Sequence, residues 1–357
     1  MSTLKKISEL EPLSIVNFSK ELIDAVSNLS VYETKIKDMR LDGYIYLPKL
    51  NMIEALSSMQ IEGTRTTMEE VISSELIPEI KNPDINEVRN HNNALTKGSR
   101  RVKIEGFTEE NIKDLHQALM AGIKNKNKTA IIGEYKTKNN CIRNSAGAIV
   151  YNAPPVEETK EYMDELISFM NDANQIIYHP LVNAAIIHAQ FESIHPFEDG
   201  NGRLGRLLIP LYLYSKNVID APLFYISEAI GKDKYRYYKT LQETRDGDYN
   251  EWIRYFLEKC SIQAKKHIDY LEKIDKLYDK MEKIIDDNFN SGKNIELLKS
   301  LFKYPIITSK KLSETINVSI VQANRILKDL EDIKILYTDG KRRNTSYYFG
   351  ELLSYIV

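Results

Sequence analysis

Apolar residues recur at helical spacing along most of the chain, and the most regular run spans residues 180–194. Apolar side chains three to four positions apart fall on one helix face, so this run predicts a buried helix that ends before Pro196. Residues 204–214 are again strongly apolar and predict a second helix, which begins near Gly202. The polar, glycine-containing residues between the two runs should therefore form a tight loop.

The N-terminal part also has a helical pattern. Residues 1–90 are expected to be mainly helical, with amphipathic stretches at 14–29 and 31–39. Pro48 should open a further segment, because proline lacks the N–H that a helix interior uses. We therefore expect a helical region ahead of the two main apolar runs.

Residues 131–155 break the helical pattern. Their β-branched residues alternate with turn formers around residues 144–147, which predicts a β-hairpin ended by Pro154 and Pro155. A helix predicted at 108–123 precedes the hairpin, and Thr108 has a suitable side chain for its N-cap. The fold class predicted here is therefore mainly α, with a small β element in the middle of the chain.

The C-terminal part begins with a long charged helix. Residues 258–290 carry one apolar stripe among many charges, as expected of a helix that links and braces two domains; a homodimer built on that stripe is the alternative. The elements expected beyond it follow the order of a winged helix-turn-helix. They are a helix at 295–302, a short helix opening at Ser309, a helix at 321–330 and two strands around 339–340. The predicted regions of the chain are 1–90, 91–257, 258–292 and 293–357.

Composition limits the class of protein. The 357 residues carry a formal net charge of −2, which gives no whole-chain signal for a nucleic-acid or membrane partner. Cys141 and Cys260 lie far apart without metal-ligand spacing, which excludes a disulfide framework and fits a reducing compartment. The longest apolar run, residues 207–214, is too short to span a bilayer. We expect a soluble cytoplasmic protein.

Residues 195–206, with the sequence HPFEDGNGRLGR, concentrate groups suited to phosphate chemistry. His195 titrates near neutral pH and can accept a proton from a hydroxyl nucleophile. Asp199 offers a hard oxygen ligand for a magnesium ion that is held jointly with phosphates. The loop should lead into the N-terminus of the next helix, whose free N–H groups and dipole attract anions.

The remaining residues of this loop supply donors to phosphate oxygens. Gly200 and Gly202 can adopt positive φ and let backbone N–H groups approach a phosphate closely, and Asn201 can add a side-chain donor. Arg203 and Arg206 bring planar, permanently charged groups that match phosphate oxygens. Together these residues indicate chemistry on a nucleotide phosphate with a hydroxyl acceptor.

The run satisfies the signature HxFx(D/E)GNGRxxR in every fixed position, and by this motif the chain resembles the Fic family. The resemblance implies a helical Fic core with a hairpin flap. It also implies an enzyme that transfers AMP from ATP, with Mg²⁺, to a Ser, Thr or Tyr hydroxyl of a protein, self-modification included. It assigns the general base to His195, the magnesium ligand to Asp199, phosphate binding to Gly200, Asn201, Gly202, Arg203 and Arg206, and a core position to Phe197.

A second stretch with the same resemblance is EALSSMQIEGT, residues 54–64. Ser58, Glu62 and Gly63 match the inhibitory-helix motif (S/T)xxxE(G/N) of many Fic proteins. The i, i+4 spacing puts Ser58 and Glu62 on one helix face, with Gly63 as a natural C-cap. The resemblance implies that Glu62 pairs with Arg206 and occupies the space of the ATP γ-phosphate. In some relatives this glutamate positions a water that removes AMP, so AMP removal is an alternative activity.

The predicted hairpin stands where Fic proteins have their flap. In that family the flap aligns the target segment by main-chain pairing, as strand addition allows. Lys136 departs from the family here, because relatives often have arginine at this position.

One rival interpretation is a metal site. His188, Glu192 and His195 are spaced i, i+4 and i+7 and share a helix face, as the ligands of a metal ion can. A zinc ligand could not also serve as a neutral base, so we favour the base at His195 and packing roles for His188 and Glu192. We expect His116 to be a structural histidine as well.

The predicted winged helix raises a second class of function, a DNA-binding transcriptional regulator. Residues 293–347 contain eleven Lys or Arg against six Asp or Glu, a net charge of +5. Side chains that could reach a DNA groove are Gln322, Asn324, Arg325 and Lys328 on the helix, and Lys341, Arg342 and Arg343 at the wing tip. DNA binding through residues 293–357 would coexist with catalysis, and a protein-contact role is the alternative.

Overall fold

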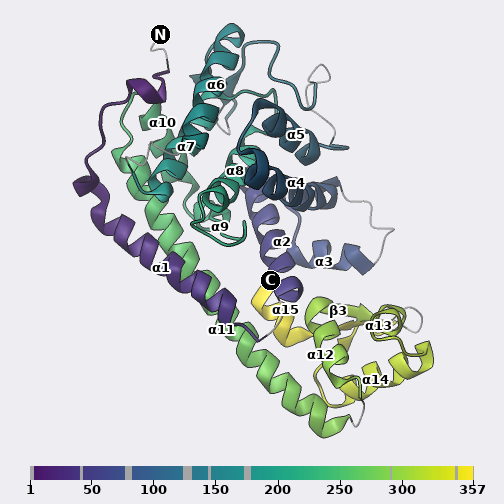
Figure 1. The fold of residues 1–357 in the computed structure, drawn as a ribbon. Helices are drawn as coiled ribbons and strands as arrows, with labels where there is room; N and C mark the ends of the chain where they lie inside the picture. Colours follow the sequence, from purple (N-terminus) through teal and green to yellow (C-terminus); the bar gives the residue numbers. More distant parts are fainter. Residues whose placement is uncertain are drawn as a thin grey trace. The chain divides into compact units, whose positions relative to one another are not determined.

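The computed structural model describes residues 4–40, 43–76, 83–123, 131–143, 146–172, 178–289, 292–341 and 345–356. These residues are mainly helical and include two small antiparallel sheets (Figure 1), which confirms the predicted fold class at that level. In this described part, no helix is long and apolar enough to cross a membrane. The chain forms two compact units. Met1–Glu33, Glu54–Arg65 and Asn86–Lys265 make up the first, and Thr34–Ile53, Thr66–Ile85 and Lys266–Val357 the second.

Helices account for most of the elements along the chain. Up to the hairpin the elements are η1 (Ile7–Glu9), η2 (Ile15–Phe18), α1 (Ser19–Asp38), α2 (Gly43–Ile61), α3 (Met68–Leu76), α4 (Pro83–Glu105), α5 (Glu109–Leu119), β1 (Cys141–Arg143) and β2 (Ile149–Asn152). After it come α6 (Val156–Asn171), α7 (Pro180–Ile194), α8 (Asn201–Ser215), α9 (Ser227–Gly231), α10 (Lys234–Arg245), α11 (Asn250–Asn288), α12 (Asn294–Lys303), β3 (Ile306–Thr308), α13 (Ser309–Ile316), α14 (Ile320–Asp332), β4 (Tyr337–Thr338), β5 (Ser346–Tyr348) and α15 (Gly350–Ile356).

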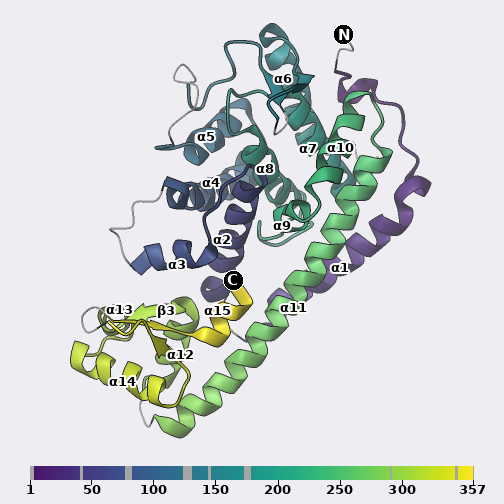
Figure 2. The ribbon, with the colours of Figure 1, turned by 180° about the vertical axis from the view of Figure 1, so that it is seen from behind.

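The first unit is built around α7 and α8, which pack against each other at its centre (Figures 1 and 2). The side chain of His179 caps α7 by accepting a hydrogen bond from the backbone N–H of Leu181 at 3.2 Å, and all residues from 181 to 194 are buried. α8 begins directly after Gly200 and is also largely buried. The two predicted apolar helices are therefore confirmed, and the motif loop joins them.

α11 begins earlier than predicted. The carboxylate of Asp248 accepts a hydrogen bond of 3.0 Å from the backbone N–H of Asn250 and so starts the helix there, ahead of the predicted position 258. Within the first unit, Trp252 of α11 donates a hydrogen bond from Nε1 to the carbonyl oxygen of Ala185 in α7, at 2.8 Å. The first turns of α11 thus belong to the core around the motif.

The N-terminal helices differ from the prediction in two places. The stretches 14–29 and 31–39 form the short turn η2 and one continuous helix, α1. Ser30 lies within that helix, and its hydroxyl donates to the carbonyl oxygen of Val26 at 2.9 Å on the helix surface. Pro48 lies inside α2 instead of opening a segment. Since proline removes one main-chain hydrogen bond, α2 tolerates a single missing bond there.

β1 and β2 form the predicted hairpin. The strands pair antiparallel, with Cys141 opposite Asn152 and an irregularity between Ile142 and Arg143. Of the predicted turn at 144–147, residues 144–145 lie outside the described residues, and Gly147 has a φ of +80°. The prediction of α5 is confirmed too, because the hydroxyl of its N-cap Thr108 accepts a hydrogen bond from the backbone N–H of Asn111 at 3.1 Å.

The C-terminal elements of the second unit follow the predicted order of helices and strands. α12, α13, α14, β4 and β5 all lie where the pattern predicted them. β3 and α15 were not predicted, because three strand residues and seven helix residues are too short for their periodicity to stand out. The sheet has the order β3-β5-β4. The predicted wing-tip residues Arg342 and Arg343 lie outside the described residues.

The second unit also includes N-terminal segments of the chain. Arg40 forms ion pairs with Asp279 at 2.5 Å and with Glu282 at 3.1 Å, and the buried Lys49 donates to the carbonyl oxygen of Phe302. These contacts join residues near the end of α1 and within α2 to the C-terminal helices inside this unit. The pattern of apolar positions carries no sign of such a joint core.

Candidate active site

The motif loop is pinned from within by Asn201. Its side-chain Oδ1 accepts a hydrogen bond from the backbone N–H of Phe197 at 2.9 Å, and its Nδ2 donates to the carbonyl oxygen of Phe197 at 2.8 Å. Asn201 is buried, and Phe197 is fully buried beneath the loop, as predicted. The Asn201 amide therefore holds the loop, and its role as a donor to phosphate stays a prediction.

His116 supports the same loop from α5. Its ring stacks on Phe197 with the centroids 3.8 Å apart and the planes 9° apart. Its Nδ1 accepts from the backbone N–H of Gly133 at 3.0 Å, which leaves Nε2 to donate to the carbonyl oxygen of Asp199 at 2.9 Å. Burial lowers the pKa of His116 to about 4, so the neutral ring is the form that makes these contacts. The structural role predicted for His116 is confirmed.

His195 is the residue that ends α7, and its backbone is left-handed with a φ of +49°. Burial lowers the pKa of its imidazole to about 4, and the positive charges of Lys136 and Arg245 act in the same direction. Its Nδ1 has no hydrogen-bond partner among the described residues. The ring is therefore neutral near pH 7, and one of its two nitrogens can accept a proton.

Asp199 and Gly200 form the turn into α8. Gly200 has a φ of +79°, a conformation that glycine adopts without strain, and its N–H donates to Oδ1 of Asp199 at 2.7 Å. A third of the Asp199 side chain is exposed. In the described part of the chain, no three His, Cys, Asp or Glu side chains are grouped to hold a metal ion. Asp199 is thus a single accessible carboxylate at the start of a helix.

Arg206 is held by Ser58 and Glu62. Only 2% of its side chain is exposed. Its Nε donates to the hydroxyl of Ser58 at 2.8 Å, and its Nη2 donates to the carbonyl oxygen of Ser58 at 3.0 Å and to Oε1 of Glu62 at 2.8 Å. The structure therefore brings together the three residues that the resemblance linked. The inhibitory role of this contact stays a prediction.

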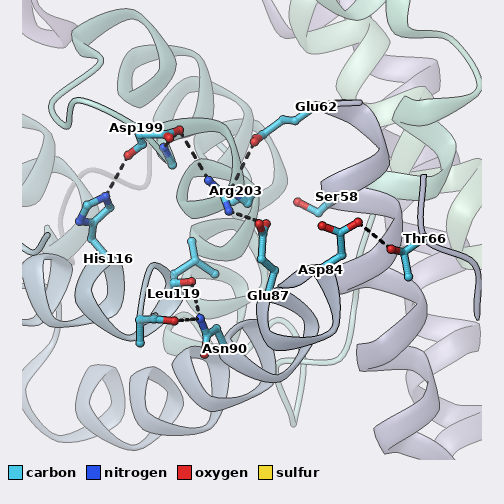
Figure 3. A network of polar contacts seen from close by, with 12 residues as sticks. Ser58, Glu62, Thr66, Asp84, Glu87, Asn90, His116, Leu119, Asp199 and Arg203 are labelled. Carbon is cyan, nitrogen blue, oxygen red and sulfur yellow. Dashed lines mark hydrogen bonds and ion pairs between the residues drawn. The ribbon is translucent and has the colours of Figure 1, made fainter. Parts of the chain in front are cut away.

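Arg203 lies among three carboxylates, as Figure 3 shows. Its Nη1 donates to Oε2 of Glu87 at 2.6 Å, its Nε lies 3.3 Å from Oε2 of Glu62, and its Nη2 lies 3.6 Å from Oδ1 of Asp199. Glu62 thus bridges Arg203 and Arg206, whereas the resemblance linked it to Arg206 alone. Glu87 on α4 was missed, because nothing in its sequence surroundings distinguishes it from other helix-surface glutamates.

Glu62 fills the space in front of the N-terminus of α8. A Cβ atom placed on Gly202 would lie 2.7 Å from Oε1 of Glu62, so the glycine leaves room for the carboxylate there. Glu62 is the first residue after α2 rather than part of its last turn, and Gly63 follows with a φ of +102°. The predicted capping position of Gly63 agrees with this geometry. The Glu62 carboxylate therefore lies close to the groups expected to bind phosphate.

The rival metal group is occupied by other contacts. Nε2 of His188 lies 2.9 Å from the hydroxyl of Tyr237 and is hydrogen-bonded to it. Glu192 is buried, which raises the pKa of its carboxyl to about 7, and a Cβ on Gly205 would lie 2.5 Å from its Oε1. His188 and Glu192 are therefore packed into the core behind the loop, in agreement with the packing roles expected for them.

Lys136 and Asn140 are two further residues that the sequence did not mark as site residues. Nζ of Lys136 donates to the carbonyl oxygen of Ile194 at 3.1 Å, and Nδ2 of Asn140 donates to that of His195 at 3.0 Å. Both side chains come from the segment that leads into β1. The segment before the hairpin thus contacts the backbone of the motif loop directly.

Comparison with known proteins identifies the region that contains this site. Residues 106–213 match the Fic/DOC family, and residues 19–100 match the N-terminal region of that family. The protein adenylyltransferase Fic of Aedes aegypti is 32% identical over 99 residues, which are 28% of this chain and 18% of the relative. This chain therefore matches only a small part of the curated relatives it is similar to.

Two solved structures share the fold. A Fic family protein from Desulfovibrio desulfuricans G20 has a TM-score of 0.60 at 19% identity, over 95% of this chain and 97% of that chain. Fic-1 (residues 134–508) from Caenorhabditis elegans has a TM-score of 0.54 at 20% identity, over 72% of this chain and 74% of that chain. At such identities the likeness concerns the fold alone.

Proposed function

Since the chain carries a Fic/DOC family domain, we propose that it is a protein adenylyltransferase that Glu62 holds inactive at rest. It transfers AMP from ATP to a Ser, Thr or Tyr hydroxyl of a protein, self-modification included. One observation carries the proposal: the Glu62 carboxylate lies between the buried Arg203 and Arg206, close to Gly202 at the start of α8. An anion held in this way marks a site suited to phosphate oxygens.

The donors around Glu62 are those that a triphosphate needs. The first N–H groups of α8 have no partner within the helix, and the helix dipole favours negative charge at this end. Arg203 and Arg206 add charged donors that are largely shielded from water, where such hydrogen bonds are strong. Gly200 and Gly202 leave the backbone open to close approach. When Glu62 moves away, these groups are free to bind ATP.

His195 supplies the base in the proposed step. The hydroxyl oxygen of the target bonds to the α-phosphorus of ATP, the bond between that phosphorus and the oxygen bridging to the β-phosphorus breaks, and pyrophosphate leaves. The hydroxyl proton passes to the imidazole, which is neutral near pH 7 because burial lowers its pKa to about 4. The fixed backbone of His195 keeps the ring oriented for this transfer.

Asp199 fits a magnesium ion that is bound together with ATP. Mg²⁺ keeps several waters and usually takes one or two carboxylates besides substrate phosphates, so a single accessible carboxylate is sufficient. When bound, the ion neutralises negative charge on the phosphates.

Glu62 and ATP compete for the same two arginines in this proposal. A change that moves Glu62 must supply the difference in free energy between the two states, typically about 1–3 kcal/mol, or roughly 5- to 150-fold in affinity. The glutamate that inhibits transfer could also orient a water for removal of AMP, which is the alternative activity of the same site.

The deciding experiment compares wild type, Glu62→Gly, Glu62→Gln and His195→Ala with Mg²⁺ and ATP labelled at either the α- or the γ-phosphate. We expect protein label from α-labelled ATP only, a large increase with Glu62→Gly and none with His195→Ala. Glu62→Gln keeps the size of the side chain and removes its charge, so it separates electrostatic from steric blocking. Label from the γ-phosphate would show a kinase instead, and equal rates in Glu62→Gly and wild type would exclude inhibition by Glu62.

Removal of AMP is tested on the product of the same reaction. Protein labelled by Glu62→Gly is isolated, separated from ATP and incubated with fresh wild type or with Glu62→Gly. Loss of label with wild type alone would assign hydrolysis to Glu62. Retention of label with both proteins would leave transfer as the activity of this site.

We also propose a winged helix-turn-helix at residues 293–357, supported by the order of its helices and strands. The case for DNA binding is weaker. Arg325 and Lys328 are exposed on α14, but Gln322 takes part in the N-cap of that helix and Asn324 accepts a hydrogen bond from Ser309. The similar proteins lend no support to DNA binding or to a homodimer. A salt-dependent shift of duplex DNA by the full chain would establish DNA binding, and no shift at low salt would favour a protein-contact role.

A further inference from the structure

Lys136 joins the segment before the hairpin to the end of α7. It is almost completely buried, with 3% of its surface exposed. Its ammonium group donates to the carbonyl oxygen of Ile194 at 3.1 Å, to that of Pro154 at 2.9 Å and to Oδ1 of Asn140 at 3.0 Å. Its backbone N–H donates to the carbonyl oxygen of Pro196 at 2.8 Å. All three ammonium donors are thus used, and the acceptors are amide oxygens rather than a carboxylate.

Asn140 completes the contact with the loop. Its Nδ2 donates to the carbonyl oxygens of His195 and Phe197, both at 3.0 Å, while its Oδ1 accepts from Lys136. As a result, the successive carbonyl groups of residues 194–197 each accept a hydrogen bond from Lys136 or Asn140. Hydrogen bonds from these two residues therefore fix every carbonyl group of this short segment.

That segment contains a strained residue. His195 has φ and ψ angles of 49° and 58°, a left-handed conformation that is strained for a residue other than glycine. Such a conformation persists only where the surroundings determine it. Because His195 follows the last turn of α7, a small rotation of its backbone would turn the ring away.

From this geometry we propose that Lys136 and Asn140 are positioning residues, which hold the backbone of His195 so that its imidazole is aimed at the reacting hydroxyl. The inference rests on the proposed function and deepens it. β1 begins directly after Asn140, and Pro154 follows β2, so the same two side chains tie both ends of the hairpin to the base. A target segment bound along the hairpin would therefore be aligned with His195 by one set of hydrogen bonds.

The test uses Asn140→Ala and Lys136→Met in the Glu62→Gly background, where transfer is measurable. Two neighbours on the same segment give matched controls: the exposed Asn139, whose Oδ1 accepts from the backbone N–H of Val156 at 2.9 Å, and the exposed Lys138. We expect kcat to fall on the order of 10- to 100-fold in Asn140→Ala and Lys136→Met, with KM for ATP nearly unchanged. Asn139→Ala and Lys138→Met should keep full activity, and Lys136→Arg should recover part of the loss.

A second measurement does not depend on activity. The charged groups that act on the His195 ring are Lys136 and Arg245, which lower its pKa, and Asp199, which raises it. Nuclear magnetic resonance of ¹⁵N-labelled histidine should therefore show a higher pKa of His195 in Lys136→Met than in Lys138→Met. In a plot of transfer rate against pH, the fall in rate at low pH should move to higher pH by the same amount as the pKa of His195.

The outcomes separate the two proposals. Unchanged kcat and unchanged His195 resonances in both Asn140→Ala and Lys136→Met would overturn the positioning role. A fall in thermal stability with kcat preserved would show an ordinary structural anchor and would overturn it too. If no variant transfers AMP, the proposed function fails, while displaced His195 resonances in Asn140→Ala would still support the hold on this residue.

Discussion

Oε2 of Glu87 lies 2.6 Å from Nη1 of Arg203, and both side chains are largely buried. This pair directs Nη1 toward α4, so Nε and Nη2 of the same guanidinium face Glu62 and Asp199. When Glu62 moves away, those two nitrogens are the ones that can meet a phosphate. We therefore expect Glu87 to orient Arg203 for ATP rather than to compete with ATP.

The first prediction concerns Glu87→Gln in the Glu62→Gly background. Loss of the charge-assisted hydrogen bond should leave Arg203 less ordered and raise KM for ATP roughly tenfold, with a smaller effect on kcat. Steady-state kinetics with varied ATP measures both constants. Glu105→Gln, an exposed change on the same helix, is the control. A lower KM for ATP would mean that Glu87 competes with the nucleotide after all.

The second prediction concerns Ser58→Ala. The change removes the acceptor of Arg206 Nε and leaves a buried charged donor unpaired, which should weaken the resting arrangement by about 1 kcal/mol. Transfer by the resting enzyme should rise roughly fivefold and stay well below that of Glu62→Gly, because the carboxylate still contacts both arginines. Initial rates with α-labelled ATP measure the difference. Reduced transfer would show instead that Ser58 supports the active state.

The third prediction compares two glycines of α8. A Cβ on Gly202 meets the flexible end of Glu62, whereas a Cβ on Gly205 lies 2.5 Å from Glu192 and 3.2 Å from Phe191 in the core. Gly205→Ala should lower the free energy of unfolding by about 1–3 kcal/mol through overpacking. Gly202→Ala should cost less than Gly205→Ala, because the carboxylate of Glu62 is one-third exposed and can shift, and because alanine favours the helix. Thermal unfolding of the two variants checks this order, and the opposite order would contradict the geometry.

Gly202 gives a further test of whether Glu62 and ATP use the same space. In the Glu62→Gly background, Gly202→Ala should reduce binding of ATP, because the new methyl group occupies the position taken by the carboxylate at rest. Calorimetric titration of ATP into both proteins measures the effect. Equal affinities would show that the phosphates lie elsewhere.

The fourth prediction concerns pH and the buried Glu54. Burial raises the pKa of its carboxyl from 4.5 to about 7, although the backbone N–H and hydroxyl of Ser227 both donate to it. The folded state therefore holds this proton over a pH range in which the unfolded state has lost it. The contribution of Glu54 to stability is complete below about pH 4.5 and falls as the pH rises to about 7, by roughly 3 kcal/mol.

Denaturant unfolding of wild type and Glu54→Gln across pH 4–8 checks this. The stability of wild type relative to the variant should decline between about pH 4.5 and 7 and stay constant above. The buried histidines titrate in both proteins, so their effects cancel in the difference. A difference that is independent of pH would show that the Glu54 carboxyl has an ordinary pKa.

The core of the site could be predicted because its residues are contiguous. Twelve positions carry the base, the carboxylate, the glycines and both arginines, and the apolar runs on either side show two helices that must bring them to one loop. The contact of Glu62 with Arg206 could not be predicted from neighbouring positions, because 144 positions separate the two residues. It was expected only from the family resemblance.

The remaining contacts could not be predicted, because they depend on which faces of distant elements meet the loop. Glu87 and Asn140 are ordinary polar residues in their local sequence, and only tertiary packing places them beside Arg203 and His195. Periodicity also locates helix ends poorly, which explains the merging of two predicted stretches into α1 and the early start of α11. Asn201 shows a different limit, since a motif position does not say whether a side chain faces a ligand or its own loop.

Gly63 lies at a position where a substitution would change how the proposed resting state holds Glu62. It follows Glu62 directly, its φ of +102° is one that side chains rarely adopt, and no atom of the described residues lies within 4 Å of where its Cβ would be. Substitution there would alter the backbone that carries the carboxylate without disturbing any neighbouring side chain. Under the proposed inhibition by Glu62, substitution at this exposed position would therefore adjust the activity of the resting state in small steps, by selection or by design, without a change in the motif loop.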